Sequence, residues 1–420
     1  MTINQNSQDR LFYKSIEVGF INGNGEVNDA KNKEGIEPII EVFPIFLNNS
    51  LPEGERYDSF IRHISHENKT LVGVAKNLDE LPGKLSINKL DDRLYVPFPN
   101  IPDNIVYAKT TLDSNMFFVN SELRLSHKPS FSGYQDKFTA KAEIIDGKLN
   151  ISHINTEKEY GNVIVKPYNK KFFGITQNEF VCMKLANKVG LEVPKVFLIE
   201  HPDNRIPIKH LCVKRFDFTD TFPFEKKEMM EFTTLMGLNS KRKASVKTEE
   251  FFKHAEKCLD KSELEKLGKT YFFGLLICNG DMHLKNFSVF IMNNKTYQLT
   301  PIYDMVNIHV YGDKDILALP MTESFNPSPH ISIITDFLAQ YIIKEDMYKM
   351  IETVENNLID ILNLAYPNEE ERKPIIDARN HFCRYPEREE MGSCTYDSLK
   401  NSILTRVAEV KGTLDNRIKV

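Results

Sequence analysis

The sequence has no tryptophan, no long apolar run and no closely spaced pair of cysteines. A membrane-spanning helix needs about 18 consecutive apolar residues, so we expect no membrane partner. The six cysteines are scattered without a C-x-x-C pair. In a long chain they are expected to be buried thiols rather than disulfides or zinc ligands. The polar start MTINQNSQDR lacks the apolar core of a signal peptide, which predicts a cytoplasmic protein.

An excess of basic residues is also missing. The chain carries 54 Lys and Arg against 59 Asp and Glu, a formal net charge of -5. Neutralising nucleic-acid phosphates requires a basic face, so this balance argues against a dedicated nucleic-acid-binding protein. It leaves open a partner that binds DNA. The length of 420 residues and the hydrophobic content of 41% are ordinary for a globular protein of two or three structural units.

The first 100 residues are expected to form a separate unit. IEVGFINGNGEVN alternates apolar residues around a Gly-Asn-Gly turn and predicts a hairpin. Asn49 or Ser50 is a candidate N-cap for a following helix. The three prolines of VPFPNIPDN indicate a boundary at about residue 100.

Residues 101–218 carry the pattern of strands plus one helix. The predicted helix is TQNEFVCMKLANKVGL, with Thr176 as N-cap, Glu179 at the capping-box position and Gly190 near its C-terminal end. The predicted strands are the hairpin KFTAKAEIIDGKLNISHI and the segments NVIVKPY and HLCVKRFDF. This region is therefore a small β-rich lobe.

Residues 219–420 are predicted to be mainly helical. The stretch from EEFFKHAEK to Gly280 has helical periodicity, and NFSVFIMNNKTYQLTPIYD predicts two short strands around an Asn-rich turn. The predicted fold class is α+β, with two lobes and a cleft between them that is a natural ligand site.

The stretch ICNGDMHLKNFSVF, residues 277–290, brings chemically active side chains together. Asp281 and Asn286 are five residues apart, and Asp304 follows in TPIYD. Asp-x4-Asn, a strand pair and a second Asp form the arrangement that phosphoryl transfer requires. One carboxylate accepts the proton of the attacking hydroxyl, while an Asn oxygen and a second carboxylate hold Mg²⁺, which prefers oxygen ligands. Isolated Asp and Asn residues usually form turns, but the three together favour function.

His283 and Lys285 lie within the same stretch. Lys285 is a candidate to approach the transferred phosphoryl group as a point charge. His283 is a weaker catalytic candidate, because a lone loop histidine is more often structural. The sequence around His283 has no set of zinc ligands at the usual spacing.

A kinase also needs a cation at the ATP phosphates. Lys166 lies on a predicted strand before the helix that carries Glu179, and a strand lysine paired with a helix glutamate positions ATP in kinases. The alternative is a solvated lysine and a capping glutamate. SFSGYQDKF, residues 130–138, has one glycine and no G-x-G-x-x-G, yet its backbone and Lys137 are candidates for phosphate binding. Ser130 and Ser132 are candidate phosphorylation sites there.

The chain resembles the HipA-type toxin kinases, the serine/threonine kinases of bacterial toxin–antitoxin systems. The resemblance is carried, in order, by SFSGYQDK, VIVKP, NEFVCMKLANKVGLEVP, CVKRFDF, NGDMHLKNFSVF and LTPIYDM. FPIFLNNSLPEGE and TLVGVAKN resemble the extra N-terminal subdomain of that family. The resemblance implies a two-lobed protein-kinase-like fold with ATP and Mg²⁺ as cofactors. Its parts would be an N-terminal subdomain (1–100), a kinase N-lobe with the phosphate loop (101–218) and a helical C-lobe (219–420).

The same resemblance implies roles for single residues. Asp281 would be the catalytic base, Asn286 and Asp304 would bind Mg²⁺, and Lys166 would bind the ATP phosphates. A hinge around the nucleoside would be formed by Lys214, Arg215, Phe216 and Asp217. Family members have Glu where this chain has Lys214, so only backbone contacts to adenine are expected at that position.

Regulation and partners are implied as well. The family autophosphorylates the serine that matches Ser130, which ejects the phosphate loop and silences the kinase, and Ser132 is a second acceptor here. A phosphoserine adds about -1.5 to -2 charge where ATP phosphates bind. The implied partner is a small helix-turn-helix, HipB-like antitoxin that makes most DNA contacts, and the implied substrate is a protein such as an aminoacyl-tRNA synthetase.

Two other hypotheses stay open. Lipid kinases share the D-x-H-x-x-N loop that DMHLKN matches, and antibiotic kinases share the D-x4-N core, so the substrate could be a lipid or a small molecule. The second hypothesis is a binding-only pseudokinase, against which the intact carboxylates argue.

Overall fold

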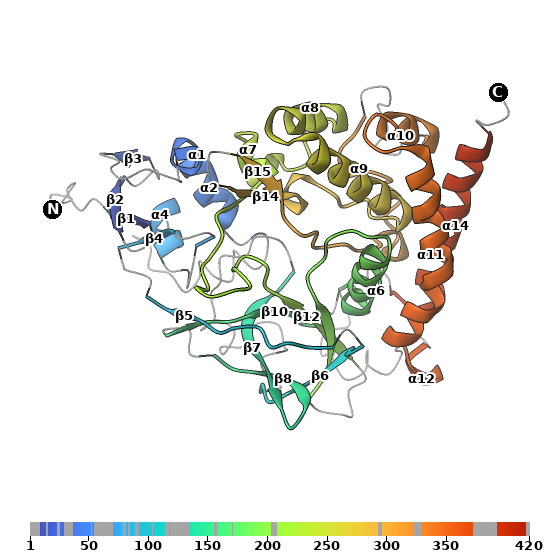
Figure 1. The fold of residues 1–420 in the computed structure, drawn as a ribbon, viewed down its shortest axis with the longest axis horizontal. Coiled ribbons are helices and arrows are strands. Elements are labelled where there is room, and N and C mark those ends of the chain that lie inside the picture. The colour runs from blue at the N-terminus through green and yellow to red at the C-terminus, as the bar shows by residue number, and fades with distance from the viewer. Residues whose placement is uncertain are drawn as a thin grey trace.

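The structure of the chain is a computed structural model. It describes residues 9–13, 16–22, 26–28, 37–51, 53, 70–76, 78, 81–82, 85–88, 92–102, 104–113, 117, 135–154, 158–169, 171–202, 208–292, 296–321, 330–372 and 393–416. The chain folds into two lobes and an N-terminal subdomain (Figure 1).

The small lobe is a closed β-barrel. Its strands are β6 (Tyr107–Thr110), β7 (Phe138–Ile145), β8 (Lys148–Ser152), β10 (Val163–Lys166), β11 (Val196–Glu200) and β12 (Lys209–Lys214). Around the barrel the order is β10-β12-β11-β6-β8-β7. The predicted hairpin is confirmed as β7 and β8, which pair antiparallel across a turn that contains Gly147 with φ of 72°. Phe138, Ala140 and Ala142 alternate into the barrel core, as expected for strands.

The small lobe also carries helix α6 (Ile175–Lys188), which the sequence predicts to within three residues. The predicted N-cap is wrong, because Gly174 occupies that position with φ of 72° and Thr176 lies inside the helix. The Thr176 hydroxyl instead donates to the carbonyl of Lys209 at 2.8 Å. Gly190 follows the helix with φ of 87°, a left-handed conformation that glycine adopts without a steric penalty.

The large lobe is mainly helical, as predicted. Its helices are α7 (Phe232–Leu235), α8 (Thr248–Cys258), α9 (Lys261–Leu276), α10 (Ile331–Leu338), α11 (Lys344–Ala365), α12 (Glu369–Arg372) and α14 (Tyr396–Asn416), with 3-10 turns η3 (Ser240–Arg242), η4 (Leu284–Asn286) and η6 (His309–Tyr311). The stretch predicted as helical up to Gly280 is two helices. Asp260 separates them, because its side chain caps α9 by accepting from the Glu263 N–H at 2.9 Å.

A small sheet in the large lobe presents the loop that carries Asp281 and Asn286. It contains β13 (Met229–Glu231), β14 (Ser288–Ile291) and β15 (Tyr297–Leu299) in the order β13-β14-β15. The predicted strand pair is therefore confirmed as β14 and β15, which are antiparallel.

The N-terminal subdomain has a four-stranded sheet and short helices. They are β1 (Asp9–Tyr13), β2 (Ile16–Ile21), β3 (Val27–Asn28), β4 (Leu85–Ile87), α1 (Glu37–Glu41), α2 (Phe43–Ser50) and α4 (Leu71–Lys76). The predicted hairpin is confirmed as β2 and β3. Asn49 and Ser50 are not N-caps, since both lie in the last turn of α2. The chain reaches the small lobe by β5 (Leu94–Tyr95), which pairs with β9 (Glu159–Tyr160).

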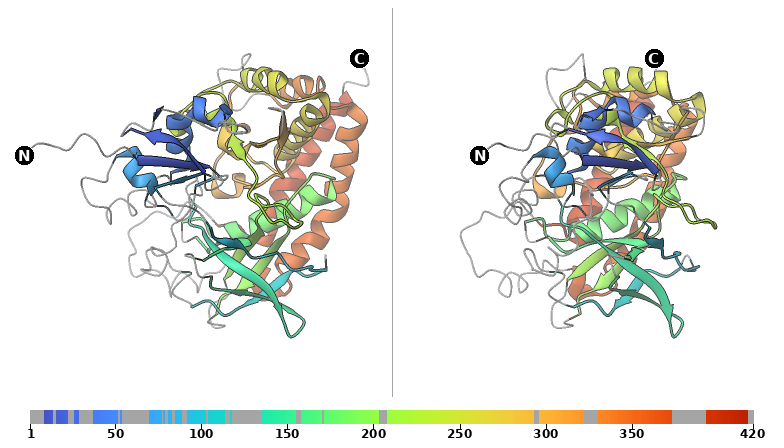
Figure 2. Two further views of the ribbon diagram at one scale, coloured as in Figure 1. Left: turned by 60° about the vertical axis from the view of Figure 1, so that its left-hand side comes forward. Right: turned by 90° about the vertical axis from the view of Figure 1, so that its left-hand side faces the viewer.

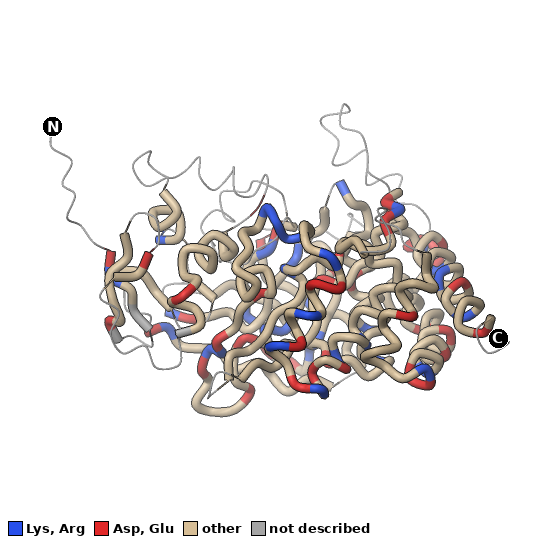
Figure 3. Tube along the Cα trace, turned by 90° about the horizontal axis from the view of Figure 1, so that it is seen from above, with Lys and Arg blue, Asp and Glu red and all other residues tan. Residues whose placement is uncertain are grey.

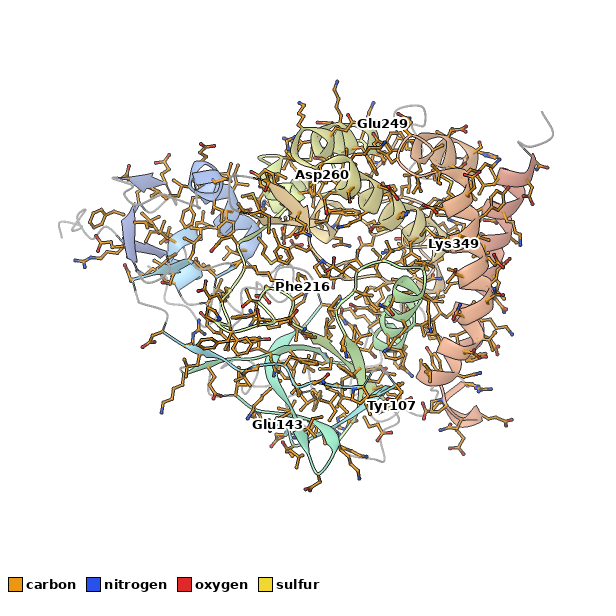
Figure 4. All side chains as sticks on the ribbon, viewed as in Figure 1. Tyr107, Glu143, Phe216, Glu249, Asp260 and Lys349 are labelled. Carbon is orange, nitrogen blue, oxygen red and sulfur yellow. The ribbon has the colours of Figure 1, made fainter. Side chains whose placement is uncertain are left out.

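The described residues form two separate apolar cores. The N-terminal subdomain, α6 and the large-lobe helices share one continuous apolar core, while the barrel has its own. Figure 2 shows the N-terminal subdomain beside the large lobe and above the barrel. Asn49 anchors that contact by donating to Thr234 Oγ1 at 2.8 Å and to the Leu238 carbonyl at 2.9 Å. The barrel is tied to α11 by Tyr107, whose hydroxyl donates to the Leu364 carbonyl (Figure 4).

No helix in the described ranges is long and apolar enough to cross a membrane. Figure 3 shows acidic and basic residues interspersed along the described trace, in keeping with the small net charge.

Candidate active site

A cavity of about 770 Å³ is lined by all three parts of the molecule. The small lobe supplies Lys166 and Glu179, and the large lobe supplies Asp281, Asn286 and Asp304. The N-terminal subdomain contributes Phe46, Asn49, Ser50, Glu53, Leu81 and Pro82. The residues that the sequence places far apart, from 166 to 304, thus line one site. A pocket of this size suits a nucleotide together with part of a second molecule.

Lys166 is the electrostatic centre of the cavity. It ends β10, and its buried ammonium lies 2.5 Å from Glu179 Oε1 on α6 and also contacts Asp304 Oδ1. Burial alone would lower the pKa of Lys166, but the carboxylates of Asp304 and Glu179 raise it above its usual range. Lys166 in turn holds the pKa of Asp304 well below normal, although burial acts in the opposite direction. The ammonium and the Asp304 carboxylate are therefore both charged at neutral pH.

The loop from Asp281 to Asn286 is closed by its own hydrogen bonds. The carbonyl of Asp281 accepts from the His283 N–H at 2.8 Å and from Asn286 Nδ2 at 2.8 Å. Because the Asn286 amide nitrogen is used in this way, its oxygen is left to bind a ligand. An Asn oxygen and the nearby Asp304 carboxylate are hard donors of the kind Mg²⁺ prefers. The donor set therefore fits the predicted metal.

The described residues contain no group of three or more His, Cys, Asp and Glu side chains that could hold a metal by themselves. Mg²⁺ keeps several waters and is commonly held by one or two protein groups plus substrate phosphates. Asn286 and Asp304 agree with that mode of binding rather than with a closed protein cage. The Asp304 side chain is 33% exposed, so it remains accessible from the cavity.

Asp281 lines the cavity, and its surroundings make it a weaker acid. Burial raises its pKa to about 6; Lys243 opposes this rise, while Asp304, Asp313 and Glu53 add to it. A general base works best when its pKa lies near the operating pH. Asp281 is thus ionised at neutral pH and basic enough to accept a hydroxyl proton.

His283 is surrounded by protein, as expected for a residue that shapes the loop. It is buried, and burial together with Lys243 lowers its pKa to about 4, so the ring is neutral at pH 7. Its backbone N–H helps to close the loop. These contacts favour the interpretation that His283 shapes the loop.

Asp304 is held in an uncommon backbone conformation. Its φ is 54°, in the left-handed region, where residues other than glycine are rarely found outside functional or tightly constrained sites. The preceding Tyr303 fixes this loop, because its hydroxyl donates to the Lys285 carbonyl at 2.8 Å and lies 2.6 Å from Ser288 Oγ. The two loops that carry Asn286 and Asp304 are therefore joined directly.

The charged side chains of the predicted hinge, residues 214–217, form ion pairs. Arg215 and Asp217 pair with each other through two hydrogen bonds of 2.9 and 2.6 Å. The Lys214 ammonium lies 2.5 Å from Asp220 Oδ1, and Lys214 is not among the described residues that line the cavity, so backbone contacts to adenine at this position stay a prediction. Phe216 lies between the lobes (Figure 4), stacked on Tyr303 with ring centroids 5.8 Å apart.

Lys285 lines the cavity, and its charge is already paired. Its buried ammonium lies 2.5 Å from Glu53 Oε1 and 3.7 Å from Glu231 Oε2, and it donates to the Asn49 carbonyl at 2.9 Å. These contacts satisfy the charge and fix the loop to the N-terminal subdomain. The sequence did not indicate these contacts, because the acidic partners are remote in sequence.

The phosphate loop is only partly described. Lys137 lines the cavity, and its charge contributes to the low pKa of Asp304. Ser130 and Ser132 lie outside the described residues.

Two cavity residues were missed by sequence reasoning. Glu53 lies after α2, and Lys243 follows η3; their side chains form an ion pair of 3.0 Å. Neither residue belongs to a local motif. Only the basic run SKRK and the acidic residues of PEGE mark them as charged, which is too common a signal to single out a site.

The chain is similar to a known protein family, to curated relatives and to solved structures. The HipA-like C-terminal domain family matches residues 129–361, more than half of the chain. Y4dM of Sinorhizobium fredii, named as a candidate kinase, is 28% identical over 291 residues, which cover 65% of this chain and 64% of Y4dM. The serine/threonine-protein kinase toxin HipA of Shewanella oneidensis is 28% identical over 216 residues, covering 46% of this chain and 45% of that toxin.

The chain matches less than two thirds of the length of these curated relatives. A solved chain from the Shewanella oneidensis MR-1 complex of HipA, HipB and operator DNA superposes with a TM-score of 0.62 at 16% identity. That match covers 98% of this chain and 99% of the solved one, and it establishes a two-lobed, kinase-like α+β fold. The chain therefore belongs to the family of proteins with a HipA-like C-terminal domain.

Proposed function

We propose that this protein is an ATP-dependent serine/threonine protein kinase that arrests growth as the toxin of a toxin–antitoxin pair. The observation that carries the proposal is the position of Lys166. Its ammonium contacts Glu179 and Asp304 at once, in the cavity that also holds Asp281 and Asn286. A lysine–glutamate pair of this kind, with a base and a metal-binding Asn and Asp across from it, is the set of parts used for phosphoryl transfer.

Each residue has a defined task in this proposal. Lys166 and Lys137 bind the phosphates of ATP, and the segment 215–217 borders the nucleoside. Asn286 and Asp304 hold Mg²⁺, which supplies charge neutralisation at the phosphates. Asp281 orients the acceptor hydroxyl and takes its proton. The pKa of about 6 supports this assignment, because the carboxylate is free to accept a proton at neutral pH.

Regulation is part of the same proposal. Ser130 and Ser132 precede Lys137 in sequence, and Lys137 lines the cavity. A phosphate on either serine would place negative charge where the phosphates of ATP bind. Intact-mass analysis after incubation with Mg·ATP should show added phosphate on one or both serines. Phosphate found only elsewhere would overturn this switch.

The proposed partner is a small helix-turn-helix, HipB-like antitoxin that binds DNA and neutralises the kinase. This part of the proposal is supported by the name of the solved complex, which contains HipB and operator DNA. The proposed substrate is a bacterial protein such as an aminoacyl-tRNA synthetase. Phosphoproteomics after brief expression identifies it.

The test of the proposed function is label transfer from γ-labelled ATP in a heat-treated bacterial extract. We expect label in the protein fraction with the wild-type chain, and none above background with Asp281→Ala. Growth arrest should be lost in the same variant. Label confined to the lipid or small-molecule fraction would replace the proposal by a different phosphotransferase, and an absence of Mg·ATP binding in calorimetry would replace it by a pseudokinase.

A further inference from the structure

Lys243 is a cavity lysine to which the proposed mechanism gives no task. It follows η3 and lines the cavity together with Asp281 and Asn286. Its side chain is 29% exposed, and its ammonium donates to Glu53 Oε2 at 3.0 Å. Among the described residues, Glu53 is the one acceptor of that ammonium. An ammonium has three N–H donors, so the remaining ones are available to a molecule bound in the cavity.

Lys243 is fixed by contacts of its backbone carbonyl and of its side-chain ammonium. Its backbone carbonyl accepts from the N–H of Leu284, inside the loop 281–286, at 3.0 Å. At the other end, Glu53 is itself anchored, because its second oxygen lies 2.5 Å from Lys285 Nζ. The Glu53 carboxylate of the N-terminal subdomain therefore binds both Lys243 and Lys285, and Lys285 is part of the loop 281–286. A cation fixed in this way loses little conformational entropy when a ligand binds.

We propose that Lys243 contacts the transferred phosphoryl group from the side of the acceptor, and that Glu53 is the positioning residue that holds it there. This inference rests on the kinase function proposed above. It assigns to Lys243 the point charge that the sequence suggested for Lys285, whose ammonium is enclosed by Glu53, Glu231 and Asn49. Lys166 would then act on the nucleotide side of the phosphoryl group and Lys243 on the opposite side.

The chemistry of transfer explains the value of a second cation. A bond forms between the acceptor hydroxyl oxygen and the γ-phosphorus, while the bond to the β–γ bridging oxygen breaks and its electron pair stays on ADP. The hydroxyl proton passes to Asp281. Charge is spread over the equatorial oxygens in the transition state, so a fixed ammonium there lowers the barrier. An interaction made chiefly in the transition state raises kcat with little effect on KM for ATP.

The charge of Lys243 acts on residues of the loop 281–286, and Lys243 lines the cavity together with Asp281. Its charge lowers the pKa of both Asp281 and His283. Asp304, Asp313 and Glu53 act on Asp281 in the opposite direction. The charge of Lys243 thus acts on Asp281 against burial and the three carboxylates, which agrees with a place at the acceptor side.

The test compares Lys243→Met with Lys241→Met in the full chain. Lys241 is an exposed lysine of η3 and is the matched control. Initial rates of label transfer from γ-labelled Mg·ATP into heat-treated bacterial extract give kcat and KM. For Lys243→Met we expect kcat to fall on the order of 10²-fold with KM for Mg·ATP within about twofold of wild type. Lys243→Arg should recover most of the loss, and Lys241→Met should match wild type.

Glu53→Gln tests the positioning role. We expect it to lower kcat, and to lower it by a smaller factor when Lys243 is already Met, because part of its effect acts through that lysine. If Lys243→Met does not fold, Lys243→Gln decides by the same comparison.

Two results would overturn the inference alone: Lys243→Met with the kcat of Lys241→Met, or Lys243→Met with unchanged kcat and a raised KM for Mg·ATP. The second result would place the lysine at the nucleotide. A wild-type chain that transfers no label would overturn the kinase function and this inference together, so the two failures are distinguishable.

Discussion

Glu179 Oε1 lies 2.5 Å from Lys166 Nζ, and this ion pair joins a barrel strand to a helix that packs in the core of the large lobe. Both side chains are almost fully buried. Since α6 shares its apolar core with the large lobe, the lysine is placed relative to Asp304 by the packing of the whole molecule. The proposed nucleotide site is therefore pre-formed by the packing of the fold.

Lys166→Met should weaken the binding of Mg·ATP. The substitution removes the cation that compensates Glu179 and Asp304, so two negative charges would then face the phosphates. We expect at least a tenfold loss of affinity in calorimetry, equivalent to about 1.4 kcal/mol. Lys214→Met is the matched control, because Lys214 pairs with Asp220 and does not line the cavity. Equal affinities for the two variants would contradict the assignment of Lys166.

The pH profile of kcat/KM should show an acid limb near pH 6. Burial raises the pKa of Asp281 to about 6, and the base must be ionised to accept a proton. Activity is therefore present above this pH and is lost as the pH falls through it. Asp313→Asn removes one of the charges that raise this pKa, so it should move the limb to lower pH. A profile that is flat from pH 5 to 8 would argue against Asp281 as the base.

Gly174→Ala should destabilise the fold more than Gly190→Ala. Both glycines have left-handed backbones, with φ of 72° and 87°, so the conformational cost of about 1–2 kcal/mol is shared. A Cβ on Gly174 would also lie 2.5 Å from the Cys394 carbonyl oxygen, whereas a Cβ on Gly190 would meet nothing within 4 Å. The difference between the two free energies of unfolding, from urea titration, measures the clash. Equal values would show that the contact with Cys394 relaxes at no cost.

Asn49→Ala should loosen the N-terminal subdomain from the large lobe. The substitution removes two buried hydrogen bonds and leaves the Leu238 carbonyl unpaired, which costs about 1–3 kcal/mol. Asn48→Ala is the control, because Asn48 is exposed and its contact with Ser240 is 3.5 Å long. We expect a lower urea midpoint for Asn49→Ala only. An unchanged midpoint would mean that the apolar contacts alone hold the subdomain in place.

The sequence predicted most of the elements that carry the site, because their signals are local. Periodicity and turn residues indicated the hairpin at 138–152, helix α6 and the pair β14–β15. The spacing of Asp281, Asn286 and Asp304 predicted a shared site, and all three residues line one cavity.

What the sequence could not indicate depends on contacts between remote segments. Lys285 looked free beside Asn286, but it is neutralised by Glu53 from the N-terminal subdomain. Thr176 had the right residue type for an N-cap, yet Gly174 takes that place because the chain passes close to Cys394. Lys243 belongs to no motif, and only the fold brings it to the cavity.

The most direct measurement of the central claim is single-turnover label transfer by Asp281→Asn at saturating Mg·ATP, beside calorimetry of the same variant. The amide keeps the shape of the carboxylate but cannot take the hydroxyl proton. We predict an affinity for Mg·ATP within about threefold of wild type and a loss of transfer rate of roughly 10²–10⁴-fold. An Asp281→Asn variant that binds Mg·ATP and transfers label at the wild-type rate would contradict the proposed active site.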